Sequence, residues 1–147
     1  MNNILTVCIG NICRSPVAEA LLKAALPEKN IWSAGLAALE GHAADKTAQE
    51  IALEHGLDIS AHRAQQITSY MCTQADLILV METTHKQELE QKYPFTRGKV
   101  HCLGHTSPTQ KTEIADPYRK NRDAFMTSHL AIAQGVSHWA SLIKKIG

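Results

Sequence analysis

The sequence has almost no net charge, no long hydrophobic run and no leader-like start, and each absence narrows the possible functions. A formal net charge of +1 gives no large field for nucleic acid or an anionic membrane surface, so we expect neither partner. No segment approaches the roughly 18 apolar residues that a membrane-spanning helix needs, so we predict no membrane insertion. The first residues lack the basic and apolar regions of a signal peptide. We therefore expect a cytoplasmic protein.

The four cysteines do not have the spacing of a disulfide framework or a zinc knuckle. They stand at positions 8, 13, 72 and 102, and no Cys-x-x-Cys pair occurs. Disulfide frameworks are also uncommon in a chain of 147 residues without a secretory signal. His101, Cys102 and His105 are close in sequence, but strand alternation places the first two on opposite faces. We therefore predict no metal site and no cofactor, and at least one chemically active cysteine.

The chain has no repeat, low-complexity segment or linker, so we predict a single domain, residues 1–147. Short apolar runs predict strands, and apolar residues at helical spacing between them predict crossover helices. The expected strands are residues 4–8, 31–34, 77–81 and 99–103. This alternation is typical of parallel strands joined by helices in an α/β fold. Ligands in such open sheets bind at the carboxyl ends of the strands.

Capping signals predict where the helices begin and end. Ser15 is a candidate N-cap for the first helix, because serine can accept a hydrogen bond from an unpaired N–H group. Asp45 is a candidate N-cap for a second helix, which Gly56 should end. Residues 84–87 have the spacing of a capping box before a third helix. Apolar residues across 125–143 predict a long closing helix.

The segment that follows the first expected strand, Cys8 to Pro16, carries the strongest functional signal. Cys8 and Arg14 stand six positions apart, and Ser15 opens a helix. Gly10 can adopt a positive φ and allows the backbone to approach a ligand. Loop N–H groups and the helix start can converge on one anion, and the planar Arg14 fork matches two phosphate oxygens. We therefore predict a phosphate-binding loop that favours the Cys8 thiolate.

This loop predicts a phosphatase that works through a cysteinyl-phosphate, and such chemistry benefits from an acid. A tyrosine phenol has a pKa of about 10, so its departure from phosphorus is helped by a proton. Asp116 lies between the last expected strand and the closing helix, at the ligand end of the sheet. Pro117 stiffens that loop and Tyr118 offers an aromatic wall. Asp116 is therefore the candidate acid, and the base toward water in the second step.

Cys8 to Pro16, with Ala18 and Glu19 after it, resembles the active-site loop of the low-molecular-weight protein tyrosine phosphatases. Further matching segments follow in chain order: Ser33 to Gly35, His62, Asp76 to Met81, and Asp116 to Tyr118. The resemblance covers nearly the whole chain. It implies a three-layer α/β domain with a four-stranded parallel sheet, in the order 2-1-3-4, and helices on both faces. It also implies that Cys8, Arg14 and Asp116 are catalytic.

The same resemblance implies roles for the residues around the loop. Ser15 would donate a hydrogen bond to the Cys8 sulfur, and Asn11 would support the loop. Ser33 and His62 would in turn hold Asn11. The residues expected to bind substrate are Ile9, Gly10, Asn11, Ile12, Cys13, Ser15, Leu39 and Tyr118.

At two positions, Leu39 and Arg119, the sequence resembles the members of this family that come from Gram-negative capsule and exopolysaccharide gene clusters. The resemblance therefore implies a phosphotyrosine protein as substrate, with the tyrosine-rich tail of a membrane tyrosine autokinase as the expected partner. We expect the protein to be a monomer or a weak dimer.

Two other functions remain open from the sequence. An arsenate reductase on the same scaffold shares the loop spacing, but it relays oxidation through two further cysteines close together. Cys72 and Cys102 stand 30 positions apart, which disfavours such a relay. A non-catalytic phosphate-binding or phosphotyrosine-binding module would not need the Cys8 thiol and the Asp116 carboxylate together.

Cys13 shares the tight loop with Cys8, so the two sulfurs could come within disulfide reach. We hypothesise a reversible Cys8–Cys13 disulfide that protects Cys8 from overoxidation.

Overall fold

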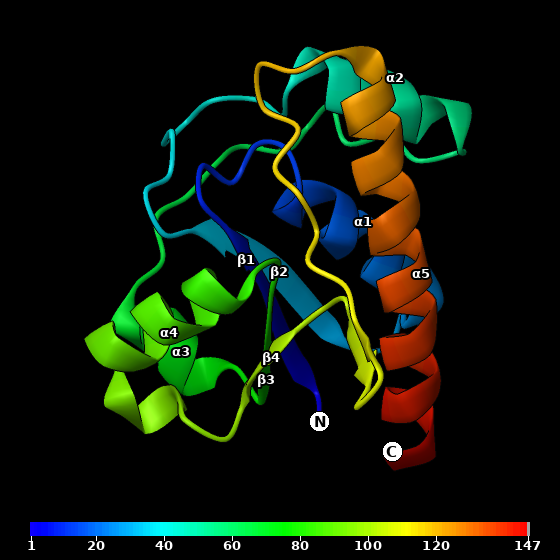
Figure 1. Cartoon of the computed structure of the whole chain (residues 1–147). Coiled ribbons are helices and arrows are strands. Elements are labelled where there is room, and N and C mark those ends of the chain that lie inside the picture. Colours follow the sequence, from blue (N-terminus) through cyan, green and yellow to red (C-terminus); the bar gives the residue numbers. More distant parts are fainter. Residues whose placement is uncertain (147) are drawn as a thin grey trace.

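In the computed structural model, which describes residues 1–146, a parallel sheet lies at the centre and helices cover both of its faces (Figure 1). Its strands are β1 (Asn3–Cys8), β2 (Asn30–Gly35), β3 (Leu77–Val80) and β4 (Val100–Cys102). Their order is β2-β1-β3-β4, and each neighbouring pair is parallel. The predicted α/β fold and strand order are confirmed, and each strand boundary lies within one residue of its expected position.

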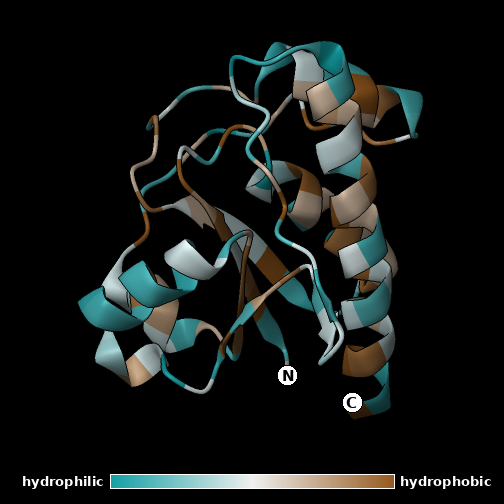
Figure 2. Ribbon diagram, viewed as in Figure 1, coloured by the Kyte–Doolittle hydropathy of each residue, from teal (hydrophilic) through white to brown (hydrophobic). Residues whose placement is uncertain are grey.

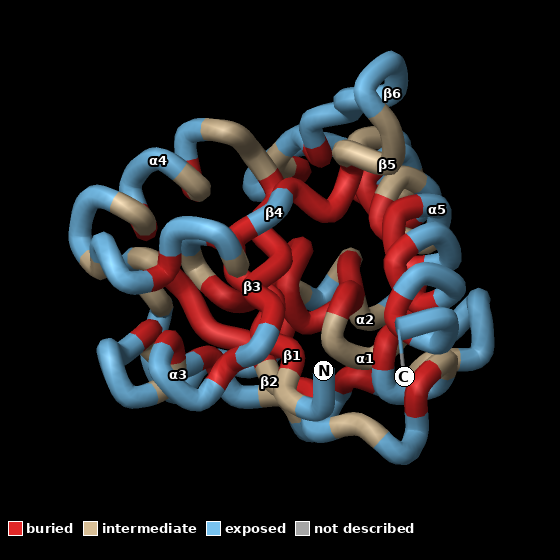
Figure 3. The backbone as a smooth tube through the Cα atoms, turned by 90° about the horizontal axis from the view of Figure 1, so that it is seen from below, coloured by how far each residue is buried: buried red, intermediate tan, exposed pale blue. Residues whose placement is uncertain are grey.

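The strands are apolar along most of their length because both faces of the sheet are buried. Alternate residues of a strand point to opposite faces, so each strand contributes to two cores. Ile4 of β1 and Leu79 of β3 lie in one core, whereas Leu5 and Val80 lie in the other. Figure 3 shows the buried strands at the centre, with exposed surface on the outer side of the helices.

Five helices form the outer layers of the described chain. On one face lie α1 (Ser15–Ala25), α2 (Lys46–Glu54) and α5 (Arg122–Ile146), and on the other lie α3 (Ser69–Gln74) and α4 (Thr83–Lys92). The helices carry both hydrophobic and hydrophilic residues (Figure 2), and their buried hydrophobic residues belong to the cores on the two faces of the sheet. Within the described residues, no helix has the length and apolar character needed to cross a membrane.

Four short elements, two of them the strands of one hairpin, were not predicted from the sequence. Helix α3 has only six residues, too few for a clear helical period. A single 3-10 turn, Pro94–Thr96, follows α4. A small hairpin of β5 (His105–Ser107) and β6 (Gln110–Lys111) follows β4 and packs beside α5 (Figure 1).

Two of the predicted helix caps are wrong. Arg14 occupies the N-cap position of α1, and Ser15 lies inside the helix with its side chain turned toward Cys8. Glu82 occupies the N-cap position of α4 without a side-chain cap, so the expected capping box at residues 84–87 does not form. Both side chains at these helix starts have tertiary partners instead: Ser15 Oγ contacts the Cys8 sulfur, and Glu82 Oε2 accepts a hydrogen bond from Arg14 Nη1.

The predicted boundaries of α2 are confirmed. The Asp45 side chain accepts a hydrogen bond from Thr47 N at 2.9 Å, which satisfies an N–H group of the first turn. At the other end, Gly56 has a φ of 81°, a conformation that glycine adopts without a steric penalty.

The carboxyl ends of the strands bring distant segments together at one edge of the sheet. Cys8 and Gly35 are paired at the ends of β1 and β2, so the loops that follow leave the sheet side by side, at the end opposite the N-terminus (Figure 1). A Cβ at Gly35 would lie 2.5 Å from the carbonyl oxygen of Ile9. Glycine is therefore required for the close approach of these two loops.

Candidate active site

The loop after β1 has its carbonyl groups engaged and many of its N–H groups free. The carbonyls of Cys8, Ile9 and Gly10 accept hydrogen bonds from backbone N–H groups of the loop after β2 at 2.9 to 3.1 Å. The Ile12 carbonyl accepts from Asp45 N at 2.8 Å. In contrast, the N–H groups of residues 10–14 have no hydrogen-bond partner within the described chain. These donors are available to an anion in the pocket that the loop lines.

The loop conformation depends on Asn11 and not on Gly10. Asn11 has a φ of 59°, whereas Gly10 does not have a positive φ, so the predicted positive φ at Gly10 is wrong. Asparagine tolerates this left-handed region better than most residues. Its buried side chain fixes the turn: Nδ2 donates to Ser15 Oγ at 2.8 Å and to Ser33 Oγ at 3.0 Å, and Oδ1 accepts from Gln65 N at 2.9 Å.

The Cys8 sulfur lies at the N-terminal end of α1. Its Sγ is 2.9 Å from Ser15 Oγ and accepts a hydrogen bond from Ser15 N at 3.5 Å. Because Asn11 Nδ2 donates to the Ser15 hydroxyl oxygen, the hydroxyl hydrogen is available to the sulfur. Both donors and the positive end of the helix dipole are placed to stabilise negative charge on the sulfur.

One edge of the Arg14 guanidinium is held by the protein, and the other edge is open. Arg14 is 1% exposed, and its Nη1 donates to Glu82 Oε2 at 2.5 Å and to the carbonyl of Ile114 at 2.7 Å. Nη2 lies 3.7 Å from Asp116 Oδ2, and the buried Nε has no hydrogen-bond partner within the described residues. The Nε–Nη2 edge can therefore donate two parallel hydrogen bonds to a phosphate-like anion.

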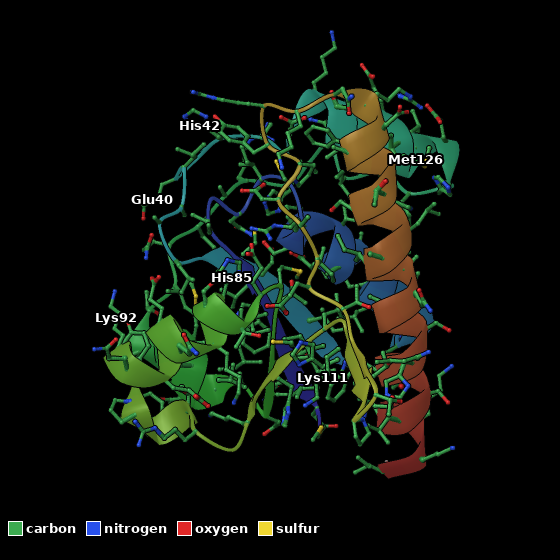
Figure 4. The ribbon with its side chains drawn as sticks, in the orientation of Figure 1. Glu40, His42, His85, Lys92, Lys111 and Met126 are labelled. Atoms are coloured by element: carbon green, nitrogen blue, oxygen red, sulfur yellow. The ribbon has the colours of Figure 1, made fainter. Side chains whose placement is uncertain are left out.

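Glu82 was missed by the sequence reasoning. The available signal was a charged residue directly after a buried parallel strand, which is where ligand sites form in open sheets. His85 Nε2 lies 3.4 Å from the same carboxylate, and Figure 4 shows His85 on the side of α4 that faces the sheet. Burial lowers the pKa of His85, and Arg14 lowers it further, so the buried ring favours its neutral form.

Ser33 and His62 both contact Asn11, and Glu19 extends this network. The His62 Nε2 lies 2.7 Å from the Asn11 carbonyl oxygen. Ser33 Oγ donates to Glu19 Oε1 at 2.5 Å, so a hydrogen-bonded chain runs from the Cys8 sulfur through Ser15, Asn11 and Ser33 to Glu19. Glu19 was not predicted, although its position four residues after Ser15 puts both side chains on one face of α1.

A pocket of about 180 Å³ opens above this loop. Its lining comes from three loops: Cys8, Ile9, Gly10, Ile12, Cys13, Arg14, Ala37, Leu39, Asp116 and Tyr118. Of the residues predicted to bind substrate, Asn11 and Ser15 do not line the pocket and instead support the loop from behind. Ala37 lines it without having been predicted.

The mouth of the pocket is apolar and exposed. Ile9, Leu39 and Tyr118 are exposed large side chains that surround the opening. Glu40 and His42, on the same loop as Leu39, point outward from the molecule (Figure 4). The opening therefore offers apolar walls to an aromatic ring, with polar groups farther out.

Asp116 is placed at this mouth by an Asx turn. Its Oδ1 accepts a hydrogen bond from Tyr118 N at 3.0 Å, while Oδ2 is the oxygen nearest Arg14. The Arg119 guanidinium lies over the Tyr118 ring, 5.2 Å from its centroid. A carboxyl group thus stands at the pocket entrance, about a hundred residues along the chain from the thiol.

Cys13 also lines the pocket, so two free thiols share it. Burial raises the pKa of the Cys13 thiol strongly, and the nearby Asp45 carboxylate raises it further. Cys13 is therefore a neutral thiol, in a setting unlike that of Cys8.

A thiol at a helix start, an arginine with one open edge and a carboxyl group around one small pocket fit the class of cysteine-dependent phosphatases. Residues 3–146 match the family described as low molecular weight phosphotyrosine protein phosphatase, so the chain belongs to this family, as the sequence motifs predicted.

Related proteins agree with this assignment. The chain is 49% identical over 145 residues to the probable low molecular weight protein-tyrosine-phosphatase AmsI of Erwinia amylovora. This alignment covers 99% of each chain. The crystal structure of the tyrosine phosphatase Wzb from Escherichia coli K30 with sulphate superposes with a TM-score of 0.91, at 41% identity and 99% coverage of each chain. The YwlE arginine phosphatase from Geobacillus stearothermophilus has a TM-score of 0.92 at 29% identity, covering 99% of this chain and 94% of that one.

Proposed function

We propose that this pocket hydrolyses phosphotyrosine in proteins, with Cys8 as nucleophile, Arg14 as phosphoryl-binding group and Asp116 as proton donor. The family is that of protein-tyrosine phosphatases. The observation that carries the assignment of residues is the guanidinium of Arg14, whose Nη1 is held while Nε has no partner within the described residues. The open edge belongs to the pocket that the Cys8 sulfur also lines. We further propose that the chain acts as one catalytic domain.

In the first step the Cys8 sulfur attacks phosphorus, and the bond from phosphorus to the tyrosine oxygen breaks. The Asp116 carboxyl gives its proton to the departing phenolate oxygen, because a phenol with a pKa of about 10 leaves poorly as an anion. The loop N–H groups and the Arg14 fork stabilise the equatorial oxygens of the transferring group. The products of this step are free tyrosine hydroxyl and a phosphocysteine.

In the second step water attacks the phosphocysteine. Asp116, now a carboxylate, takes a proton from the water, and the sulfur–phosphorus bond breaks to release inorganic phosphate and the Cys8 thiolate. The Ser15 N–H and hydroxyl groups at the sulfur make the thiolate a better leaving group. The helix start thus assists this second step most directly.

The same scaffold supports other chemistry in related proteins, and two alternatives give different outcomes in one assay. An arginine phosphatase would hydrolyse phosphoarginine faster than phosphotyrosine. An arsenate reductase would need two further thiols to relay oxidation, yet Cys13 alone shares the pocket with Cys8 among the described residues. Cys72 and Cys102 are buried in the core on the other side of the sheet.

Initial rates on phosphotyrosine, phosphoserine and phosphoarginine peptides, and on arsenate with thioredoxin, test the proposal. We expect phosphotyrosine to have the highest kcat/KM, and the Cys8→Ser variant to lose hydrolysis while it still binds vanadate. A phosphocysteine should accumulate when an aryl phosphate is mixed with enzyme and quenched rapidly. Faster turnover of phosphoarginine or arsenate would contradict the proposal.

The acid role of Asp116 has a separate test. The Asp116→Asn variant should slow hydrolysis of phosphotyrosine much more than that of an aryl phosphate with an acidic phenol, because the acidic phenol needs no proton to leave. Asp123→Asn on α5 is the matched control, since that carboxylate lies outside the pocket lining. Equal slowing of both substrates in Asp116→Asn would remove it from this role.

As physiological substrate we propose a tyrosine-phosphorylated autokinase of bacterial polysaccharide assembly, met in the cytoplasm by a monomer or weak dimer of this protein. The support is the similarity to AmsI and Wzb and the presence of Leu39 at the pocket mouth. Loss of phosphotyrosine from the purified kinase tail, faster than from an unrelated phosphoprotein, is the expected result. Sedimentation at several concentrations would report the oligomeric state.

A further inference from the structure

Cys102, His105 and Glu113 form a second cluster of reactive side chains, outside the pocket. They come from the end of β4, the start of β5 and the segment that follows β6. A thiol sulfur, an imidazole nitrogen and a carboxylate oxygen, one from each residue, all lie within 4.8 Å of one another. We propose that these three side chains bind a divalent transition-metal ion of the Zn²⁺ type.

The spacing of the three atoms is close to that of a tetrahedral site. Ligand atoms bonded at Zn²⁺ distances stand about 3.3–3.8 Å apart at tetrahedral angles. His105 Nε2 and Glu113 Oε2 are already 3.1 Å apart. The three atoms lie no more than 4.8 Å apart, so the Cys102 sulfur reaches a separation of about 3.5 Å with a shift of about 1.3 Å or less, which a change in side-chain torsion can supply.

The donor set selects the kind of ion. Sulfur and imidazole nitrogen bind Zn²⁺ and related transition metals, whereas Ca²⁺ and Mg²⁺ prefer oxygen ligands alone. Three protein ligands leave one position for water, as in the open sites of zinc proteins. The chemistry therefore favours Zn²⁺ or Co²⁺ over the alkaline-earth ions.

The surroundings hold the ligands in place and still allow entry from solvent. Glu113 uses Oε1 to accept a hydrogen bond from Thr83 N at 2.8 Å, so Oε2 stays directed at His105. Such second hydrogen bonds orient metal ligands. Cys102 is buried on β4, whereas the Glu113 side chain is 45% exposed. An ion can thus approach from the Glu113 side and meet the buried sulfur last.

The sequence argument against a metal weighed His101 with Cys102 and His105, whereas the proposed site has Glu113 in the place of His101. His101 and Cys102 do lie on opposite faces of β4, one exposed and one buried. The third ligand, Glu113, comes instead from the segment after the β5–β6 hairpin: His105 pairs with Lys111, and the chain then returns Glu113 to the end of β4. Figure 4 shows Lys111 on this hairpin.

An ion at this position would also restrain the position of the segment that leads to Asp116. Ile114, directly after Glu113, donates its N–H to the Met81 carbonyl and accepts from Arg14 through its own carbonyl. A bound metal would join this segment to β4 through Cys102. The site is separate from the catalytic pocket, since none of the three ligands lines it.

Binding is measured by calorimetric titration with Zn²⁺ and by absorption with Co²⁺, both in a Cys8→Ser background that removes the active-site thiol. We expect one ion per chain and a sulfur-to-cobalt charge-transfer band that Cys102→Ser abolishes. Glu113→Gln and His105→Gln should weaken Zn²⁺ binding by more than the roughly 10–100-fold that changes to a surrounding hydrogen bond cost. His101→Gln and Cys72→Ala are the matched controls and should bind as the parent does.

Two results would overturn the proposal. The first is no uptake of Zn²⁺ by the folded Cys8→Ser protein. The second is an unchanged affinity for Zn²⁺ in the Glu113→Gln variant. Glu113 is exposed, so we expect this variant to fold as the parent does. Circular dichroism of each variant before titration keeps the Cys102→Ser result interpretable, and Glu113→Gln decides the question if Cys102→Ser does not fold.

Discussion

Arg14 and Glu82 are joined by a hydrogen bond of 2.5 Å between Nη1 and Oε2, which links the phosphate loop to the segment between β3 and α4. The Ile114 carbonyl holds the same nitrogen at 2.7 Å. Two acceptors from different segments therefore fix the plane of the guanidinium before any anion arrives. Preorganisation of this kind reduces the reorganisation needed in the transition state.

Replacement of Glu82 should impair phosphoryl transfer without removing a group that touches substrate. A hydrogen bond to a charged group contributes about 1.5–3 kcal/mol, so Glu82→Gln should lower kcat/KM by roughly 10- to 100-fold. Steady-state rates on a phosphotyrosine peptide measure this. Glu88→Gln, an exposed carboxylate on the same helix, is the control and should retain full activity. A Glu82→Gln enzyme with unchanged kcat/KM would show that Arg14 is oriented by other contacts.

Removal of the Ser33 hydroxyl should loosen Asn11 and leave the loop less ordered. Asn11 Nδ2 would keep its bond to Ser15 but lose the one to Ser33, a change worth about 0.5–1.5 kcal/mol. We expect Ser33→Ala to weaken binding of inorganic phosphate by up to about tenfold, measured as competitive inhibition. Ser60→Ala, in an exposed turn, should leave phosphate binding unchanged. If phosphate inhibits Ser33→Ala and the parent equally, the Ser33 hydroxyl does not contribute to phosphate binding through Asn11.

Peroxide should convert Cys8 and Cys13 into an intramolecular disulfide. Peroxide oxidises the Cys8 thiolate to a sulfenic acid, and the Cys13 thiol then displaces water to form the S–S bond. Because the pKa of Cys13 is raised, the second step should speed up as pH rises. Intact mass should show the loss of two hydrogen atoms, and dithiothreitol should restore activity.

The matched variant for this oxidation is Cys13→Ala, which should lose activity irreversibly under the same dose of peroxide. Cys72→Ala should behave as the parent does, because Cys72 is buried in the other core. If the parent yields only Cys8 sulfonic acid, with no two-hydrogen loss, the two thiols do not form this bond.

The stacked pair of His55 and His129 predicts weaker folding in mild acid. Burial lowers the pKa of His129 below its ordinary value of 6.5, and His55, with its ring centroid 4.3 Å away, lowers it further. Below pH 6.5 the unfolded chain binds a proton that the folded chain does not bind, so the free energy of unfolding falls as pH falls from 6.5 toward the folded pKa. Above pH 6.5 this contribution is fully present.

Urea unfolding at a series of pH values measures how the free energy of unfolding changes with pH. For one histidine this slope is at most about 1.4 kcal/mol per pH unit. His129→Gln should have a shallower slope than the parent, with His85 contributing part of the remainder because its pKa is also lowered. His138→Gln, an exposed histidine on the same helix, should keep the parental slope. A parental slope in His129→Gln would contradict the assignment.

The fold was predictable because its strands are buried on both faces and are therefore marked by apolar runs. Leu77–Val80 is the clearest case, since every residue in it is buried. The hairpin of β5 and β6 gave no such signal, because its residues are half-buried or exposed. Short elements without a buried face leave little trace in the sequence.

The candidate site was predictable where its residues are contiguous and less so where they meet only in three dimensions. Cys8 and Arg14 belong to one loop, and the Asp-Pro-Tyr turn has its own pattern. Glu82 and the Ile114 carbonyl could not be found in this way, since a backbone acceptor carries no sequence signal. The prediction of Ser15 as a helix N-cap was wrong for a related reason. The Ser15 hydroxyl contacts Cys8 and Asn11, and these tertiary contacts could not be read from the local sequence.

The carbonyl that holds Arg14 lies a hundred residues later in the chain. A ribosome-bound chain therefore displays the whole motif from Cys8 to Pro16 long before its arginine has this acceptor. Contacts between such distant segments form late, because loop closure must come first. The emerging chain thus contains the complete sequence motif before its phosphate-binding site can form. We expect phosphatase activity only after the last third of the chain has folded against the first third.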